Sequence, residues 1–115
     1  MGDFLSLLLS LNLLIPHSGV VSRGYSSDHK GVDIICTSGD KIIAAHDGIL
    51  TSYRDFRLGN VAVLRGAKIT TLYAHLFSVS NAYMLKSGDV IGYCGNTGRW
   101  STGPHLHFEV HYDRM

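Results

Sequence analysis

The sequence is poor in charged residues, in proline and in cysteine. Charged side chains make up 17% of the 115 residues, below the roughly 25% of an average soluble protein, and the net charge is +1. A net charge this small gives no excess of positive charge to attract nucleic acid or an anionic membrane surface, so we expect neither as a partner. The chain has only two prolines against 13 glycines, so its turns depend on glycine. With 45% apolar residues, the low charge also excludes intrinsic disorder.

Two cysteines, Cys36 and Cys94, are too few for a disulfide scaffold. They could form one bridge, lie as buried thiols or bind a metal. Their spacing resembles no zinc knuckle, and a chain of this length can bury a core without disulfides. We therefore expect unpaired cysteines that pack as small apolar side chains, and on that expectation cysteine usage says nothing about the cellular compartment.

No apolar run is long enough to cross a membrane. The longest, residues 4–15, falls short of the roughly 20 residues that a membrane-spanning helix needs, although its length suits the apolar core of a signal peptide. Asp3 precedes it, no Lys or Arg does, and no A-x-A-like cleavage site follows. We expect residues 1–15 to be a packing segment or the remnant of a linker, with a weak likeness to an export signal. Residues 16–115 then form one domain of ordinary size.

Short β-rich runs separated by glycine turns follow one another from Pro16 onward. No amphipathic helical stretch lies between them, which indicates an antiparallel all-β domain and not βαβ units. Residues 77–85 are expected to be the one non-repetitive connection of any length. The expected strands are residues 32–36, 41–45, 48–53, 60–64, 68–74, 89–93 and 106–112.

Seven histidines are many for a chain with nine carboxylates, and two groups of them lie near carboxylates at suggestive spacings. His29 precedes Asp33 by four residues, which on a straight strand would separate the side chains by about 13 Å. Ligand atoms lie about 2 Å from zinc, so both can bind one ion only if His29 leaves the strand. Gly31 permits that bend. The alternative is a surface histidine in a turn and an aspartate that caps a loop.

The second group is His105, His107 and Glu109, which alternate along an expected strand and share one face. The other face is apolar and would meet the core. The alternative is an ordinary solvent-facing strand, and spacing does not decide whether both histidines bind metal or one does acid–base chemistry. His75, at the end of another expected strand, would by itself be an ordinary boundary histidine.

Three ordered motifs carry a family resemblance. They are HKGVDI at residues 29–34, YAHL at residues 73–76 and GNTGRWSTGPHLHFEV at residues 95–110. Together they resemble the lysostaphin/LytM-type zinc endopeptidases of peptidase family M23, and the resemblance covers about residues 16–110. It implies a mainly β fold, a single compact antiparallel β-sheet domain with an active-site groove over one face, LytM-like with a duplicated hybrid motif.

The resemblance also implies roles for the histidines. His29, Asp33 and His107 would be the ligands of one Zn²⁺ per chain, and such a set leaves the fourth tetrahedral position open for water. His75 and His105 would be a catalytic pair that does not bind the metal. One of the two would take a proton from the water, and the other would stabilise the oxyanion or protonate the leaving amine. Which does which stays open.

Four further residues are candidates beside the groove. Glu109 would accept a hydrogen bond that orients a histidine, or would be a solvated strand residue. Tyr25 could donate to the oxyanion, although we expect it to pack on the surface. Arg99 and Trp100 would wall the substrate groove. The segment before His29, residues 21–28, is shorter than in many relatives, which leaves the shape of the groove open.

The function implied is that of a zinc metalloendopeptidase that hydrolyses peptide bonds in the stem or cross-bridge of peptidoglycan, in cell-wall remodelling or lysis. This function implies that the protein acts in the cell envelope or outside the cell, which includes action as a phage protein. We expect a monomer.

One alternative is a non-catalytic LytM-like activator of cell-wall amidases, although every motif position is filled here. The other is a virion-associated wall-binding domain with a structural metal. His17, His46 and His111 lie outside the motifs and are expected at the surface, with His111 at the border of the groove.

Overall fold

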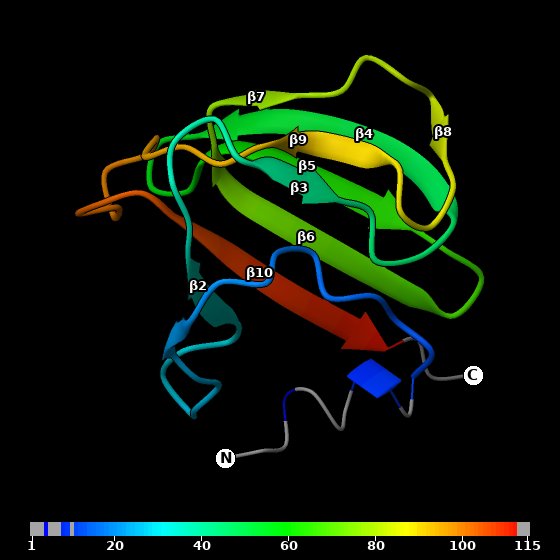
Figure 1. Cartoon of the computed structure of the whole chain (residues 1–115), viewed down its shortest axis with the longest axis horizontal. Helices are drawn as coiled ribbons and strands as arrows, with labels where there is room; N and C mark the ends of the chain where they lie inside the picture. Colours follow the sequence, from blue (N-terminus) through cyan, green and yellow to red (C-terminus); the bar gives the residue numbers. More distant parts are fainter. Residues whose placement is uncertain (1–3, 5–7, 10, 113–115) are drawn as a thin grey trace.

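Ten antiparallel strands form the framework of the described part of the chain. This computed structural model describes residues 4, 8–9 and 11–112. Seven strands form one sheet in the order β1-β2-β10-β6-β5-β4-β8, and three form a second sheet in the order β3-β9-β7 (Figure 1). The strands are β1 (Val21–Arg23), β2 (Val32–Ile35), β3 (Lys41–Ile43), β4 (Gly48–Asp55), β5 (Gly59–Arg65), β6 (Ile69–Leu76), β7 (Ser78–Val79), β8 (Met84–Leu85), β9 (Val90–Tyr93) and β10 (His105–Tyr112).

The antiparallel all-β prediction is confirmed, and each of the seven expected runs contains a strand. The structure adds three strands of two or three residues, β1, β7 and β8, which are too short to leave a periodic pattern. Two of them lie within residues 77–85, the segment that was expected to be a plain connection. The division into two sheets was also not predicted, because sequence alternation reports which face of a strand is buried and not which strands pair.

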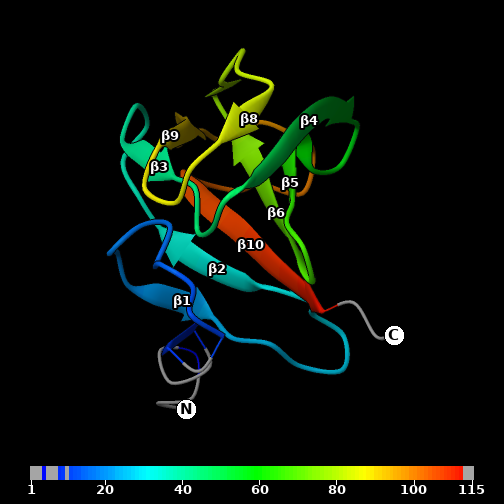
Figure 2. The same cartoon turned by 90° about the vertical axis from the view of Figure 1, so that its right-hand side faces the viewer.

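The core lies where the two sheets face each other, and Figure 2 shows the small sheet beside β10 and β6. Side chains from both sheets belong to one buried cluster, including Ile42 of β3, Ile91 of β9 and Phe108 of β10. The ring of Phe108 packs against that of Tyr73 with the centroids 5.3 Å apart. Burial of large aromatic side chains contributes much of the apolar stabilisation of such a core.

Part of the N-terminal segment packs against this core. Leu8 and Leu13 are buried, and the Leu14 N–H donates to the Ala45 carbonyl at 2.9 Å. These contacts fit the interpretation of a packing segment; residues 1–3, 5–7 and 10 lie outside the described residues, and the division of the chain after residue 15 stays a prediction. Among the described residues, no helix is both long and apolar enough to cross a membrane.

The expectation of unpaired cysteines is wrong. Cys36, directly after β2, forms a disulfide with Cys94, directly after β9, with the two Cα atoms 6.2 Å apart. The bridge joins the large sheet to the small one. The two cysteines are 58 residues apart in the sequence. They come close only when the two sheets stack, so no local sequence pattern predicts the bridge.

Candidate active site

Strand pairing brings together two of the three candidate metal ligands, Asp33 and His107. In the antiparallel register between β2 and β10, Asp33 lies directly opposite His107, so their side chains leave the sheet on the same face. The Nδ1 atom of His107 lies 2.9 Å from Oδ1 of Asp33. This face is opposite to the one on which Leu106 and Phe108 are buried, which agrees with the predicted alternation along β10.

His29 reaches the same place because it lies in a tight turn ahead of β2. Backbone hydrogen bonds join Ser26 and His29 in both directions, at 2.9 and 3.2 Å. Gly31 lets the chain pass close to β10, since a Cβ atom there would lie only 2.7 Å from the His107 ring and 2.8 Å from the Phe108 carbonyl oxygen. The predicted departure of His29 from the strand is thus what the structure contains.

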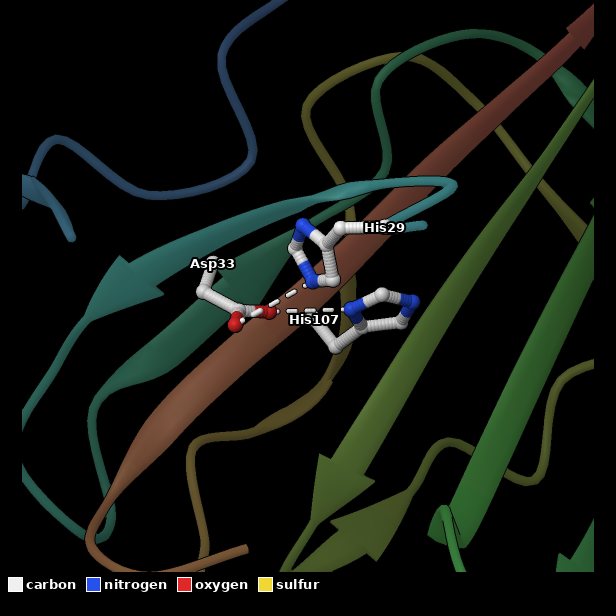
Figure 3. Close-up of side chains that lie close together, drawn as sticks. All are labelled: His29, Asp33 and His107. Carbon is white, nitrogen blue, oxygen red and sulfur yellow. Dashed lines mark hydrogen bonds and ion pairs between the residues drawn. The ribbon is translucent and has the colours of Figure 1, made fainter. Parts of the chain in front are cut away.

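The three side chains converge on one point (Figure 3). One ligand atom from each of His29, Asp33 and His107 lies within 4.8 Å of the other two, and Nε2 of His29 is 3.3 Å from Oδ2 of Asp33. Both histidines are buried, and Asp33 is half-buried. Two imidazole nitrogens with one carboxylate oxygen form a donor set that suits a catalytic zinc ion.

Each candidate histidine ligand also has a partner for its second nitrogen. The Nδ1–H of His29 donates to the Gly24 carbonyl at 3.0 Å, which leaves Nε2 toward Asp33. The Nε2–H of His107 donates to Oε2 of Glu109 at 2.8 Å, and its Nδ1, which faces Asp33, can bind a metal once it has lost its proton. Such partners fix the tautomer and orientation of metal-binding histidines, so the residues present fit a zinc ion.

Two ionised carboxylates flank His107 at this point. Burial by itself would raise the pKa of Asp33, but the hydrogen bond from His107 and the nearby histidines lower it below its ordinary value. Burial would likewise raise the pKa of Glu109, but hydrogen bonds from His107 and His111 lower it. Burial would lower the pKa of His107, but the two carboxylates raise it to about 9. Both carboxylates are therefore ionised at neutral pH, and a metal ion that binds His107 displaces the proton this ring holds between them.

His75 enters the site from a bulge in β6. Between the pairs Asn60–Leu76 and Ala62–Tyr73, one residue of β5 faces two residues of β6, and His75 has a φ of 62°. This left-handed conformation is rare in a residue with a side chain and costs about 1–3 kcal/mol. It persists because the His75 N–H donates to the Leu58 carbonyl at 2.8 Å, and bulges of this kind re-aim a side chain.

The rings of His75 and His105 lie side by side, with their centroids 4.7 Å apart. Each donates its Nδ1–H to a backbone carbonyl: His75 to Thr97 at 2.7 Å and His105 to Gly103 at 2.8 Å. A neutral ring held in this way carries its lone pair on Nε2. Burial lowers the pKa of His75, so this ring is neutral at pH 7 and can accept a proton.

All five motif residues line one cleft of about 300 Å³. Of the four further candidates, Glu109 and Trp100 line it and Tyr25 and Arg99 do not. Tyr25 lines a neighbouring apolar groove, and the Arg99 guanidinium lies 5.6 Å from the Phe56 ring centroid. Sequence reasoning missed other lining residues: Arg23, Asp28, Lys30 and Leu58. Of these, only Lys30 lies within one of the motifs.

The three histidines outside the motifs have structural partners. His17 lies 3.0 Å from a carboxylate oxygen of Asp40. His46 is hydrogen-bonded to the Asp47 carbonyl and to the Thr71 hydroxyl. His111 is more than half exposed and lies 2.7 Å from Oε1 of Glu109, so it borders the site through that carboxylate, as its position on β10 suggested.

A two-sheet β fold that gathers two histidines and an aspartate beside two further histidines defines a metallopeptidase-like class of site. The chain belongs to peptidase family M23, which its residues 27–115 match. DD-carboxypeptidase/endopeptidase Mpg of Neisseria meningitidis serogroup B is 44% identical over 85 residues, which are 71% of this chain and 20% of that protein. The chain thus spans about a fifth of the length of that relative.

Solved structures of other proteins resemble this chain in fold. An M23 peptidase from Pseudomonas aeruginosa superposes with a TM-score of 0.80 at 24% identity, over 94% of this chain and 53% of that one. This likeness bears on the fold alone. A zinc-containing peptidase from Vibrio cholerae gives a TM-score of 0.70 at 29% identity, over 87% of this chain and 32% of that one.

Proposed function

We propose that this chain is a zinc-dependent metalloendopeptidase domain that hydrolyses peptide bonds in the stem or cross-bridge of peptidoglycan. The observation that carries the proposal is the arrangement of one cleft. Three ligand atoms converge in its lining, and two further histidines, oriented by backbone carbonyls, line the same cleft. A purely structural zinc site would use four protein ligands and need no such pair.

In this proposal His29, Asp33 and His107 hold the zinc ion through Nε2, a carboxylate oxygen and Nδ1. The bound ion supplies Lewis acidity and makes a water molecule nucleophilic at neutral pH. The protein must then move protons at the neighbouring histidines. We assign proton acceptance to Nε2 of His75, because burial keeps this ring neutral.

The second catalytic role falls to His105. Its Nε2 lies 3.8 Å from Oδ1 of Asp33, so a proton on this nitrogen would face a carboxylate. A histidine that carries such a proton can donate to a developing oxyanion or to the leaving amine. The different surroundings of two adjacent rings thus support one acceptor and one donor.

We infer the substrate class from the relatives of this chain. The Neisseria relative is named a DD-carboxypeptidase/endopeptidase, and a relative from Vibrio cholerae is named a peptidoglycan DD-endopeptidase. These names support a peptide of peptidoglycan as the substrate.

We further infer that the domain acts in the cell envelope or outside the cell. Peptidoglycan lies there, and the Cys36–Cys94 disulfide supports the inference because disulfides persist in oxidising compartments and are rare in the cytosol. The disulfide therefore supplies the information on compartment that unpaired cysteines would not.

The proposal is tested by the release of soluble fragments from purified peptidoglycan sacculi. We expect activity from the wild type, loss on chelation and recovery on addition of zinc. His107→Ala should lose both zinc and activity, whereas His105→Ala should lose activity and keep zinc. Full activity of His107→Ala would contradict the metal assignment. An inactive wild type without affinity for zinc would favour the amidase activator.

A further inference from the structure

Thr97 lies in the loop after β9 and contacts the catalytic candidate His75 through its backbone. The Thr97 carbonyl accepts the Nδ1–H of His75 at 2.7 Å. This bond selects the tautomer of the ring, because a carbonyl can only accept, so the proton must stay on Nδ1. The position of one loop carbonyl thus decides that the His75 lone pair is on Nε2.

The side chain of Thr97 fixes where that carbonyl lies. Its hydroxyl donates to the Leu76 carbonyl at 2.7 Å and accepts from the Asn60 N–H at 3.1 Å. Leu76 is the next residue after His75, and Asn60 is its partner across the sheet. One hydroxyl therefore ties the loop to both strands at the bulge that aims His75.

Close packing restricts the loop further. Gly59 has a φ of 71°, and a Cβ atom there would collide with the Thr97 hydroxyl and carbonyl. Gly98 has a φ of 90° and passes directly over the turn between β4 and β5. Side chains at either glycine would displace the loop, so the loop is held both by the hydroxyl and by backbone contact.

We propose that Thr97 is a positioning residue for His75. Its hydroxyl holds the loop in register with the β6 bulge, and its carbonyl keeps the His75 proton on Nδ1 and thereby the lone pair on Nε2. Thr97 is not in the three-residue donor group, so it acts on the proton acceptor and not on the metal. The catalytic consequence rests on the proposed function, whereas the control of the tautomer does not.

The test compares Thr97→Val, which replaces the hydroxyl by a methyl group of similar size, with Thr97→Ser, which keeps the hydroxyl. Thr37→Val is the matched control, because Thr37 is exposed in the turn after β2 and its hydrogen bonds, both with Asp40, are made by its backbone N–H and carbonyl and not by its hydroxyl. The ¹⁵N NMR signals of the His75 ring report its tautomer, and the spectrum of His75→Gln assigns them. Zinc content, kcat and KM on sacculi are measured on the same samples.

We expect the Nδ1–H tautomer in the wild type, Thr97→Ser and Thr37→Val, and a mixture of tautomers in Thr97→Val. Misplacement of a reacting group costs on the order of 100-fold in rate, so kcat of Thr97→Val should fall by about 10- to 100-fold with KM and zinc content unchanged. Serine should restore it.

An unchanged tautomer and kcat in Thr97→Val would overturn the proposal, as would an equal loss in Thr37→Val. If Thr97→Val does not fold, Thr97→Ala removes the same hydroxyl without added bulk, and a native tautomer in that variant overturns the proposal. An inactive wild type would contradict the proposed function, yet the NMR comparison would still decide whether Thr97 positions the ring.

Discussion

Asp33 and His107 are 74 residues apart in the sequence, yet they face each other across the β2–β10 pair with Oδ1 and Nδ1 2.9 Å apart. This relationship makes Asp33 the centre of the site. Its other oxygen lies 3.3 Å from His29, and His105 approaches Oδ1 to 3.8 Å. One half-buried carboxylate thus organises three histidines.

We therefore expect Asp33→Asn to weaken zinc binding by more than the roughly 10- to 100-fold that loss of an outer partner of a ligand costs. The substitution keeps the size of the side chain and removes the negative charge that attracts the cation. Asp40→Asn is the matched control, because Asp40 pairs with His17 in a distant turn and is not in the donor group. Titration against a chromophoric chelator measures both affinities. Equal affinities in the two variants would contradict the central role of Asp33.

Glu109 offers a second, separable test of the metal site. Since its Oε2 accepts the Nε2–H of His107, Glu109→Ala should reduce zinc affinity by about 10- to 100-fold. Glu109→Gln keeps an acceptor without the charge and should lie between alanine and the wild type.

His111→Ala is the control for the Glu109 variants. This side chain bonds the other carboxylate oxygen and is largely exposed, so its removal should leave zinc affinity near that of the wild type. A loss in His111→Ala as large as that in Glu109→Ala would mean that the carboxylate does not act by orienting His107.

These residues show how far the sequence alone could go. Alternation along β10 predicted that His105, His107 and Glu109 share a face, because side-chain direction in a strand has a fixed period of two. The need for His29 to leave the strand followed from chain geometry, and Gly31 marked the place. Both inferences depend on local backbone geometry only.

The features that the sequence did not predict depend on contacts between segments that are distant in the chain. The disulfide between Cys36 and Cys94 exists because the two sheets stack. The left-handed conformation of His75 requires a register shift between β5 and β6 and a carbonyl from the loop at Thr97. Local sequence patterns do not encode such register shifts, so His75 could be placed in the site only through the family resemblance.

A buried tyrosine gives the fold a measurable dependence on alkaline pH. Burial raises the pKa of Tyr73 to about 12, although hydrogen bonds with Thr71 and the Ala45 N–H oppose the shift. Because the pKa in the unfolded chain is about 10, the neutral ring contributes stability fully below pH 10. This contribution is lost as the pH rises from about 10 to about 12, and it amounts to roughly 2–3 kcal/mol.

We expect Tyr73→Phe to lower the free energy of unfolding at pH 7 by about 1–3 kcal/mol, because the buried Ala45 N–H loses its acceptor. Above pH 10 the gap between the variant and the wild type should narrow. Urea denaturation at pH 7, 9, 10 and 11 measures this difference, and the other five tyrosines affect both proteins alike. A gap that stays constant with pH would contradict the assignment of the shift to Tyr73.

The disulfide is expected to stabilise the fold without shaping the metal site. Closing a loop of 58 residues stabilises a protein by about 4 kcal/mol in the chain-entropy estimate, and measured values are commonly 2–4 kcal/mol. Replacing both Cys36 and Cys94 by alanine should lower the free energy of unfolding by that amount, as measured by urea denaturation. Zinc affinity should stay within a few-fold of the wild type, because Asp33 is held by its pairing with β10, which does not include the cysteines.

Addition of a reductant should destabilise the wild type to the level of the double variant and leave the double variant unchanged. Unchanged stability in the double variant would mean that the stacked sheets confine the chain without the bridge, and a parallel loss of zinc would mean that the bridge, and not the β2–β10 register, sets the position of Asp33.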